Sequence, residues 1–477
     1  MELTPTIRTI LETLRNGGHE AYVVGGCVRD VLLGRTPIDW DVTTDAVPER
    51  IQELFPDSFY ENAFGTVTVK TDDNDPRLRE VQVTPFRTEG RYSDKRHPDV
   101  VRFAVTLEED LSRRDFTINA MAMDVDGVVV DHFNGRHDLE RGIIRAVGNA
   151  EERFAEDALR MLRVVRFATT LGFTIETRTL DAILHNRGWL KDISQERIRD
   201  EFEKIIDADA AHEGIELLRT TGLLEFIVPE LLEGVGMEQN LHHIYSVWEH
   251  NVRALKYAAD KRYSFPVRLA SLLHDVGKPR TKRGEGRRCT FYGHDVVGAR
   301  MTRGIMERLR FPKDLIDQVV KLVRFHLFYY NVGEVTESSV RRLLANVGPE
   351  YMEDLIKVRE ADRIGSGTPK AVPYKIRHLK YIIDKVSHDP VSVKMLAIRG
   401  EDVMRELGIP PGPKIGLILS TLLAEVLDEP ERNDKKHLLE RVKELNAKTP
   451  EELKKSLRRI EQALEEEEKE RMKKYYV

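Results

Sequence analysis

The sequence predicts an α/β (α+β) head with a mixed sheet, followed by an all-α remainder. Short alternating apolar runs and helical segments are interleaved as far as about residue 145. Beyond about residue 150, helical periodicity dominates, and we expect no strand pair after residue 145. The chain has 477 residues, enough for about three domains. With 41% hydrophobic and 33% charged residues, it has the composition of a folded globular protein.

Composition and charge exclude several classes of protein. Only two cysteines occur, Cys27 and Cys289, which excludes a disulfide framework and a cysteine-rich zinc module. No apolar run approaches the roughly 18–20 residues of a membrane-spanning helix, and the first segment lacks a signal-peptide core. We therefore expect a cytoplasmic protein without a membrane partner. Because the net charge is −6, any site for a polyanion must be a local concentration of Lys and Arg.

The expected elements of the head alternate between helix and strand. Residues 3–15 have the periodicity of an amphipathic helix, which Asn16-Gly17-Gly18 ends. The β-branched run over 21–26 predicts a strand, and residues 27–35 predict a helix with one apolar face. Alternating runs predict further strands over 38–42, 65–70, 80–86 and 100–105.

The remainder of the chain is expected to form successive helices. Apolar residues recur at helical spacing over 151–171, 195–206, 212–224, 246–260, 266–275, 295–309 and 313–325. The last stretch, 450–477, places apolar residues at the same spacing among Glu and Lys, which predicts one exposed helix.

A pair of glycines, Gly25-Gly26, separates the first expected strand from the helix that follows. Glycine lets a backbone come close to a ligand, and free N–H groups at a helix start bind phosphate. Arg29, in the first turn of that helix, is a cation that a triphosphate would attract. Taken alone, the two glycines are weak evidence for a ligand site and favour a simple turn.

Asp39 and Asp41 alternate with three apolar residues, Ile38, Trp40 and Val42. On a strand, side chains two residues apart share a face, so the carboxylates would lie together while the apolar residues enter a core. Two adjacent carboxylates repel one another unless a cation lies between them. Since Mg²⁺ prefers one or two carboxylates plus phosphate oxygens, the pair after the glycine turn predicts a magnesium site rather than a solvated strand edge.

Four motifs carry a resemblance to a known family. They are GGCVRDVLLGRTPIDWDV (25–42), RRDFTINAMAMD (113–124), DHFNGRHDL (131–139) and ERFAEDALRMLRVVRFATTLGF (152–173). In this order they resemble the class II nucleotidyltransferases, which comprise the tRNA CCA-adding enzymes and the bacterial poly(A) polymerases. The resemblance extends from residue 20 to about residue 230.

The resemblance implies attack by an RNA 3′-hydroxyl on the α-phosphate of a nucleotide, with release of pyrophosphate. Asp39 and Asp41 would hold the catalytic Mg²⁺ ions, which lower the pKa of the hydroxyl and neutralise charge on the attacking and leaving oxygens. Gly26 and Arg29 would contact the phosphates of the incoming nucleotide.

Arg114 and Asp115 belong to the second motif, in which charged residues precede an apolar run. The alternative to a ligand site here is a salt bridge that caps a helix. The resemblance implies that both residues lie at the nucleotide, near the ribose. A carboxylate that accepts a hydrogen bond from a 2′-hydroxyl would favour NTP over dNTP.

A polar stripe lies beside an apolar one on the helix expected over 151–171. It consists of charged residues at every third position, namely Asp157, Arg160, Arg163 and Arg166. A charged, solvent-facing side of the helix is the alternative. The resemblance implies that Asp157 and Arg160 pair with the edge of the base, and that Arg163 and Arg166 help with phosphate or structure. The rigid fork of arginine can bind a cytosine or an adenine edge, so one pocket could accept CTP and ATP.

Residues 86–100, FRTEGRYSDKRHPDV, are rich in charge and poor in core residues. They resemble the flexible loop of complete CCA-adding enzymes, which is thought to help the change from CTP to ATP and which enzymes that add only CC typically lack. The segment therefore argues against a CC-only activity, but not against an A-only activity.

Histidines and aspartates recur among the helices of the second half. His274-Asp275 follows the apolar run LASLL and precedes a glycine turn, at the buried end of an expected helix. Imidazole and carboxylate groups together suit a divalent metal, whereas an isolated histidine on an apolar helix is usually a core residue. The region resembles the HD phosphohydrolase domain. The resemblance implies core ligands at His250, His274, Asp275 and Asp362, and auxiliary ligands at His294 and His326.

Our interpretation of the sequence is a tRNA nucleotidyltransferase that adds or repairs the 3′-terminal CCA from CTP and ATP, with tRNA as its partner. An A-adding specialist or a poly(A) polymerase is the alternative within the family. A metal-dependent phosphohydrolase with an RNA-binding head is the alternative from another class. The sequence does not indicate an oligomeric state.

The expected cofactors and domains follow from the same interpretation. We expect Mg²⁺ in the head and a transition metal such as Mn²⁺, Co²⁺ or Ni²⁺ in the HD domain, where a phosphatase or 2′,3′-cyclic phosphodiesterase would be located. The expected domains are the head (1–145), a neck and body for base recognition and RNA binding (146–235), the HD domain (236–375) and a tRNA-binding body and tail (376–477).

Overall fold

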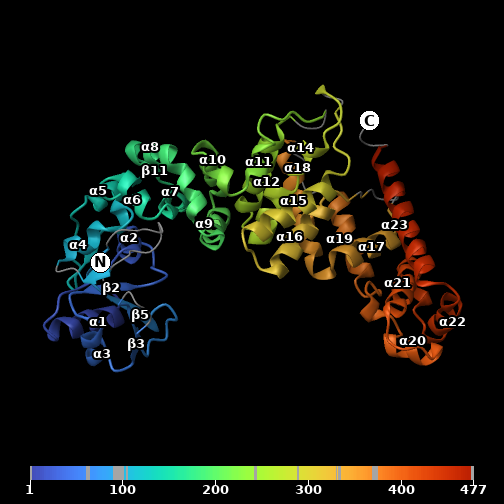
Figure 1. Cartoon of the computed structure of the whole chain (residues 1–477), viewed down its shortest axis with the longest axis horizontal. Helices are drawn as coiled ribbons and strands as arrows, with labels where there is room; N and C mark the ends of the chain where they lie inside the picture. The colour runs from blue at the N-terminus through green and yellow to red at the C-terminus, as the bar shows by residue number, and fades with distance from the viewer. Residues whose placement is uncertain are drawn as a thin grey trace. The chain divides into compact units, whose positions relative to one another are not determined.

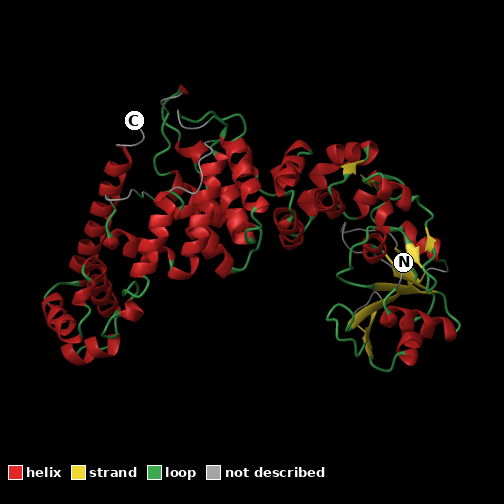
Figure 2. Ribbon diagram, turned by 180° about the vertical axis from the view of Figure 1, so that it is seen from behind, coloured by secondary structure: helices red, strands yellow, loops and turns green. Residues whose placement is uncertain are grey.

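The computed structural model divides the chain into two compact units (Figure 1). The described residues are 3–60, 65–89, 101–103, 106–240, 244–286, 289–328, 330, 335–367 and 374–473. The first unit comprises Met1–Glu233, Ala259–Phe265 and Ile305–Pro312, and the second comprises Gly234–Ala258, Pro266–Gly304 and Lys313–Val477. The strands gather in the N-terminal part of the first unit, whereas helices dominate the rest (Figure 2).

A seven-stranded mixed sheet forms the centre of the head, with the strand order β3-β4-β5-β2-β1-β8-β9. β2 and β5 run parallel, and the other neighbouring strands run antiparallel. The strands are β1 (Ala21–Val24), β2 (Asp41–Thr44), β3 (Ser58–Tyr60), β4 (Val67–Lys70), β5 (Glu80–Pro85), β8 (Ala122–Met123) and β9 (Val129–Val130). The predicted α/β head with a mixed sheet is thus confirmed.

The register of strands β2, β1 and β8 positions the candidate site. Val23 pairs with Val42, and Val24 pairs with Ala122. The end of β1, the start of β2 and the start of β8 therefore lie together. The backbone N–H of Gly25 also donates to the carbonyl oxygen of Met121 (3.2 Å). The glycine turn, the first residue of β2 and the segment before β8 are consequently neighbours.

The strand predicted over 38–42 begins only at Asp41. Trp40 and Val42 are buried as expected, but Ile38 is 80% exposed, so its expected place in a core was wrong. The reason is that Ile38 lies in a bend before the strand, where alternation of side chains does not yet hold. β3, β8 and β9 were not predicted, because strands of two or three residues are too short to show alternation.

The run over 100–105 lies outside the main sheet. It contributes β7 (Val101–Phe103), which pairs with β6 (Arg87–Glu89) in a separate two-stranded sheet. Residues 90–100 lie outside the described residues, and with them most of the segment that was compared with the flexible loop.

The helices of the head include the two that the sequence predicted. The first, α1, has Thr4 as its N-cap and buries Ile7, Leu11 and Leu14. The helices are α1 (Pro5–Asn16), α2 (Gly26–Leu32), α3 (Pro48–Leu54), α4 (Leu107–Ser112), α5 (Gly135–Glu140) and the 3₁₀-helix η1 (Thr117–Asn119).

Gly135 begins α5 where this helix meets η1. A Cβ atom at this position would lie 2.2 Å from the carbonyl oxygen of Thr117 and 2.8 Å from Met121 Cγ. Thr117 cannot easily move, because its hydroxyl donates to the buried carboxylate of Asp138 (2.7 Å). We expect Gly135→Ala to destabilise the head by about 2–3 kcal/mol, seen as a lower midpoint of thermal unfolding. Gly188→Ala, where a Cβ atom meets open space, is the control, and equal midpoints for both variants would contradict this close packing.

The neck and body follow the head as a series of helices. They are α6 (Ala150–Glu156), α7 (Leu159–Leu171), α8 (Thr177–Asn186), η2 (Arg187–Asp192), α9 (Gln195–Asp207), α10 (Ala211–Thr220), η3 (Leu223–Phe226) and α11 (Pro229–Leu232). The helix predicted over 151–171 is in fact two helices, because Asp157 between them has extended backbone angles (φ −144°, ψ 104°). One parallel pair joins β10 (Ile143–Ile144) to β11 (Thr174–Ile175), so β11, a strand that the sequence did not predict, follows residue 145 and pairs with a strand before it.

The second half of the chain is helical, as predicted. Its α-helices are α12 (Val247–Asp260), α13 (Phe265–Leu273), α14 (Lys278–Thr281), α15 (His294–Arg308), α16 (Lys313–Phe325), α17 (Glu337–Val347), α18 (Met352–Gly365), α19 (Tyr374–Val386), α20 (Gly400–Leu407), α21 (Pro413–Asp428), α22 (Lys435–Asn446) and α23 (Pro450–Lys473). The C-terminal helices share a core of their own, which includes Ile398, Ile418 and Leu422. Among the described helices, none is both long and apolar enough to cross a bilayer.

Candidate active site and metal centre

The head site begins at a glycine in the left-handed region. Gly25 has a φ of +84°, and a Cβ atom there would lie 2.9 Å from Arg114 Nη1. Gly26 then begins α2, so the predicted glycine turn between a strand and a helix is present. Glycine at position 25 provides both the backbone conformation and the space in which Arg114 approaches the turn.

Asp41 is the first residue of β2, beside the end of β1, and Asp39 lies in the bend just before it. Burial raises the pKa of Asp41; Arg114 opposes this rise, and the negative charge of Asp39 adds to it. Burial and repulsion by a second carboxylate both disfavour the ionised form of Asp41, and a bound cation would offset both effects. Arg114 lies at the same site. Two carboxylates and an arginine together fit a Mg²⁺ ion that is also bound by phosphate oxygens.

Arg29 is joined to the second motif by a short chain of hydrogen bonds. Its Nη1 donates to Asn119 Oδ1 (2.7 Å), and its Nε donates to Asp30 Oδ1 (2.9 Å). Asn119 Nδ2 donates in turn to Asp115 Oδ1 (3.1 Å). The structure thus brings Arg29 and Asp115 into one network through Asn119, a residue that the sequence did not single out.

Asp110 on α4 holds the arginines of the second motif. Its side chain is fully buried and accepts from Arg113 Nη2 (2.8 Å), Arg114 Nη2 (3.3 Å) and the backbone N–H of Arg87 (3.3 Å). Burial opposes ionisation, but Arg113 and Arg114 outweigh it and hold the pKa of Asp110 below its ordinary value. This role could not be predicted from the sequence, because Asp110 follows two glutamates in a segment that resembles a solvated helix face.

Asp115 and Arg163 form an ion pair between the second and fourth motifs, in which Asp115 is buried and Arg163 is partly exposed. Arg163 donates to Asp115 Oδ2 from both Nε (2.8 Å) and Nη2 (2.6 Å), and the backbone N–H of Phe116 donates to Oδ1 (2.8 Å). Burial opposes ionisation of Asp115, but Arg163 and Asn119 overcome it and lower the pKa to about 2. The pair therefore joins α7 to the head, and the carboxylate of Asp115 stays ionised at neutral pH.

Asp157 does not lie on the predicted helical stripe, because it occupies the break between α6 and α7. Its carboxylate pairs with Arg197 of α9, whereas Arg160 donates to Glu156 Oε2 (2.6 Å) and to the carbonyl oxygen of Arg113 (3.1 Å). The side chains of Asp157 and Arg160 thus have separate partners, although both lie at the start of α7.

Phe167 on α7 lies beneath three arginines of the site. The guanidinium carbons of Arg166, Arg29 and Arg163 lie 3.8, 5.1 and 5.5 Å from the centre of its ring. Arg166 also pairs with Glu201 of α9 (2.6 Å). Arg166 therefore has a structural anchor, and Phe167, which the sequence analysis did not single out, connects Arg29 to α7.

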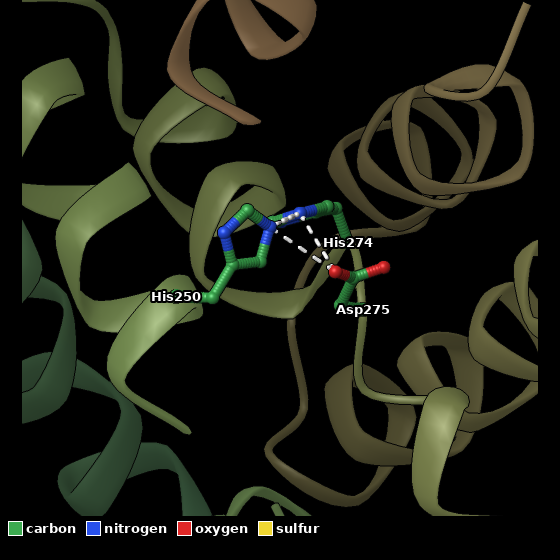
Figure 3. A group of neighbouring side chains, drawn as sticks. All are labelled: His250, His274 and Asp275. Carbon is green, nitrogen blue, oxygen red and sulfur yellow. Dashed lines mark hydrogen bonds and ion pairs between the residues drawn. The ribbon is translucent and has the colours of Figure 1, made fainter. Parts of the chain in front are cut away.

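A second cluster of chemically active side chains lies in the other unit, where His250, His274 and Asp275 converge (Figure 3). His250 comes from α12, and His274 and Asp275 directly follow α13. His250 Nε2 lies 2.9 Å from His274 Nε2 and 3.1 Å from Asp275 Oδ2. Asp362 Oδ1, from α18, lies 3.3 Å from His250 Nε2 and 3.5 Å from His274 Nε2.

Asp275 joins this cluster to two further histidines. While its Oδ2 faces His250 and His274, its Oδ1 lies 3.2 Å from His294 Nε2 and 3.7 Å from His326 Nε2. Two groups of possible metal ligands therefore share Asp275. The structure brings together all six residues that the sequence indicated for this site.

The hydrogen bonds of three histidines prepare them as metal ligands. Nδ1 of His274, His294 and His326 lies 2.7 to 2.8 Å from the carbonyl oxygens of Ser271, Phe291 and Val323. A carbonyl only accepts, so each Nδ1 carries the proton and each Nε2 presents its lone pair to the cluster. Lone pairs of neighbouring imidazoles facing one another at 2.9 Å require a cation or a proton between them, and this donor set fits a divalent transition metal.

Lys278 adds a positive charge beside the shared carboxylate. Its Nζ forms an ion pair with Asp275 Oδ2 (2.6 Å) and donates to Gln239 Oε1 (2.7 Å). Burial opposes ionisation of Asp275, but the adjacent ammonium group of Lys278 favours it, and the pKa of this carboxyl is well below its ordinary value. Asp275 is thus an anion at neutral pH, as a metal ligand must be. Lys278 and Gln239 were missed by the sequence reasoning.

Three family models match separate parts of the chain. They are described as "Poly A polymerase head domain" (residues 21–145), "Probable RNA and SrmB- binding site of polymerase A" (residues 172–234) and "HD domain" (residues 247–365). A CCA-adding enzyme from Leuconostoc mesenteroides is 34% identical over 415 residues, which cover 87% of this chain and 89% of that enzyme.

The chain belongs to the CCA-adding enzyme family.

Other members of the family resemble the chain over different lengths. The CCA-adding enzyme of Lactobacillus johnsonii is 49% identical over 217 residues, or 45% of this chain and 53% of that enzyme, so the match spans about half the length of this relative. The crystal structure of a Bacillus stearothermophilus CCA-adding enzyme in complex with CTP has a TM-score of 0.64 and 28% identity, and the match covers 93% of this chain and 98% of that one.

Proposed function

We propose that this member of the CCA-adding enzyme family builds or repairs the 3′-terminal CCA of tRNA from CTP and ATP. The observation that carries the proposal is the position of Asp41, with Asp39 beside it, against the glycine turn and Arg114. Carboxylates for a metal ion and cations for phosphates are thereby combined at one site. The likeness to a CTP-bound member of the family supports this proposal.

Asp39 and Asp41 would hold Mg²⁺, which when bound favours ionisation of the attacking 3′-hydroxyl and neutralises charge on the phosphate oxygens. The 3′-oxygen of the RNA forms a bond to the α-phosphorus of the nucleotide, and the bond to pyrophosphate breaks. Arg29 and Arg114 would bind the triphosphate, with Gly26 allowing its close approach. Asp115, held ionised by Arg163, would accept a hydrogen bond from the ribose.

Base selection would depend on the start of α7. Asp157 would accept from the amino group of cytosine or adenine, and Arg160 would donate to an acceptor on the same edge of the base. UTP and GTP present a carbonyl oxygen where CTP and ATP present an amino group, so a carboxylate discriminates between the two pairs. Arg163 and Arg166 would support the site through Asp115 and Glu201.

The proposed activity can be tested with three tRNA substrates, which lack the last three, the last two or the last nucleotide of the CCA end. We expect the two shorter tRNAs to be extended with CTP alone and all three to reach full length with CTP and ATP. Extension is measured on a sequencing gel. Growth only of the tRNA that lacks the last nucleotide would indicate an A-adding specialist, and long A tails would indicate a poly(A) polymerase.

We further propose that the second unit holds a transition metal, such as Mn²⁺, Co²⁺ or Ni²⁺, at His250, His274, Asp275 and Asp362, with His294 and His326 completing a second ligand group. The observation in favour is the convergence of ionised carboxylates with imidazole Nε2 atoms whose Nδ1 atoms are fixed. Such a metal activates water for hydrolysis of a phosphate ester, so this unit would act as a phosphatase or 2′,3′-cyclic phosphodiesterase.

The C-terminal residues 376–477 complete the proposal. We assign them to tRNA binding, through contacts to the RNA backbone and its shape. An enzyme that acts on tRNA must meet it in the compartment where tRNA matures, and we propose a cytoplasmic location on this ground.

A further inference from the structure

Asp157, the residue proposed to select the base, has an unusual local setting. The two helices on either side of it, α6 and α7, end and begin around its extended backbone. Its Oδ1 accepts from the backbone N–H of Leu159 (3.1 Å). Because the residue is not part of a helix, the plane of its carboxylate depends on such hydrogen bonds to its two oxygens.

A further partner of the Asp157 carboxylate, Arg197, comes from a different helix. It lies near the start of α9, forty residues along the chain, and donates to both oxygens of Asp157. The distances are 3.2 Å from Nη1 to Oδ1 and 2.7 Å from Nη2 to Oδ2. Two parallel N–H···O bonds hold a carboxylate in the plane of the guanidinium, which a lysine cannot do.

α9 contacts the charged residues of the α7 region at a second point. Glu201, one turn after Arg197, pairs with Arg166 (2.6 Å). Between these two contacts, Arg163 faces Asp115 of the head. α9 therefore fixes the carboxylate of Asp157 relative to the segment that carries the ion pair at the nucleotide site.

We infer that Arg197 is a positioning residue for base selection, acting on the nucleotide through Asp157. This inference rests on the proposed function. A carboxylate fixed in one plane directs its remaining lone pairs at one point, where the amino group of cytosine or adenine fits. A carboxylate free to rotate also accepts from the ring N–H of uracil or guanine, so selectivity falls.

The test compares Arg197→Lys and Arg197→Gln with the wild type. The readout is the affinity for each of the four NTPs, measured by calorimetric titration, together with single-turnover incorporation into a tRNA that lacks CCA. We expect the preference for CTP over UTP to fall about tenfold or more in both variants, with a smaller loss of rate for CTP. Arg199→Gln is the matched control, since Arg199 lies on the same helix but pairs with Asp200 and the carbonyl oxygen of Arg310.

Asp157→Asn separates this inference from the proposed function. If Asp157→Asn loses selectivity while a folded Arg197→Lys keeps the wild-type ratio, Arg197 is not a positioning residue and the inference is overturned. A uniform loss of affinity for all four NTPs in the Arg197 variants would overturn it too. Unchanged selectivity in both Asp157→Asn and Arg197→Lys contradicts base reading by Asp157 as well. Because affinities are measured directly, a protein that binds NTPs without transferring them still gives a result.

Discussion

Asp41→Asn is expected to reduce nucleotide addition by more than about 1,000-fold, the largest effect that we predict for a single substitution. Asparagine keeps the size of the side chain but removes the charge that would hold Mg²⁺ at the first residue of β2. Asp39→Asn should show a large but smaller loss, because Asp39 is exposed and lies in a bend. The measurement is incorporation of labelled CTP into a tRNA that lacks CCA.

The stability of the Asp41→Asn protein should not fall with its activity. Burial raises the pKa of Asp41, so folding disfavours its ionised form; above the folded-state pKa, ionisation lowers the free energy of unfolding. Removing this charge is therefore expected to leave the midpoint of thermal unfolding unchanged or higher at pH 7. Asp45→Asn is the matched control: its carboxylate accepts from the backbone N–H of Glu20 (2.9 Å), and its loss should leave transfer intact. An active Asp41→Asn protein, or one that fails to fold, would contradict the assignment of Asp41 to a metal.

Asp275→Asn is expected to remove most of the transition metal from the second unit, together with any hydrolysis of a 2′,3′-cyclic nucleotide. Asp275 is the carboxylate that both ligand groups share, so its neutralisation weakens both. His274→Ala should lose metal as well, although His294 and His326 remain. CCA addition should survive in both variants, because the residues proposed for it lie in the other unit and distant sites without shared partners act independently.

The control for this prediction is His388→Ala, a histidine of the same unit outside the cluster, whose Nδ1 lies 3.1 Å from the hydroxyl of Ser387. Metal content is measured by elemental analysis on the same preparations that are assayed for both activities. Wild-type protein that contains neither metal nor hydrolase activity would overturn the proposal for this unit. Loss of CCA addition in a folded Asp275→Asn protein would show that the two sites are coupled.

Pattern and spacing predicted those parts of the molecule in which a residue's role depends on its immediate neighbours. The strand before Gly25 and His274-Asp275 at the end of an apolar helix are local features, and the structure places them as predicted. Of the pair Asp39 and Asp41, only Asp41 lies on the strand, whereas Asp39 lies in the bend before it. The expectation for Ile38 was wrong because it extended the alternation of a strand into a bend that precedes it. In the same way, the three-residue spacing from Asp157 to Arg166 concealed a break in the helix.

Some of the residues that the sequence did not reveal act across long separations. Asn119 joins Arg29, far along the chain, to Asp115, and Arg197 pairs with Asp157 from another helix. These partners are given by the packing of the helices and are not visible in the local sequence.

Other missed residues act on near neighbours. Asp110 binds Arg113 and Arg114, and Lys278 forms an ion pair with Asp275 one helical turn before it. Each looks like an ordinary charged residue of a solvated segment, and its role follows from its burial.

The central claim is that the head itself selects CTP and then ATP without a nucleic-acid template. Its most direct test is the sequence of the product formed when the purified protein, Mg²⁺ and all four NTPs at equal concentrations are incubated with a tRNA that lacks the last three nucleotides. Our account predicts products that end in CCA, with U and G almost absent, and an Asp41→Asn protein that leaves the tRNA unchanged. Addition of U or G at rates near those of C and A, or extension that persists in the Asp41→Asn protein, would contradict it.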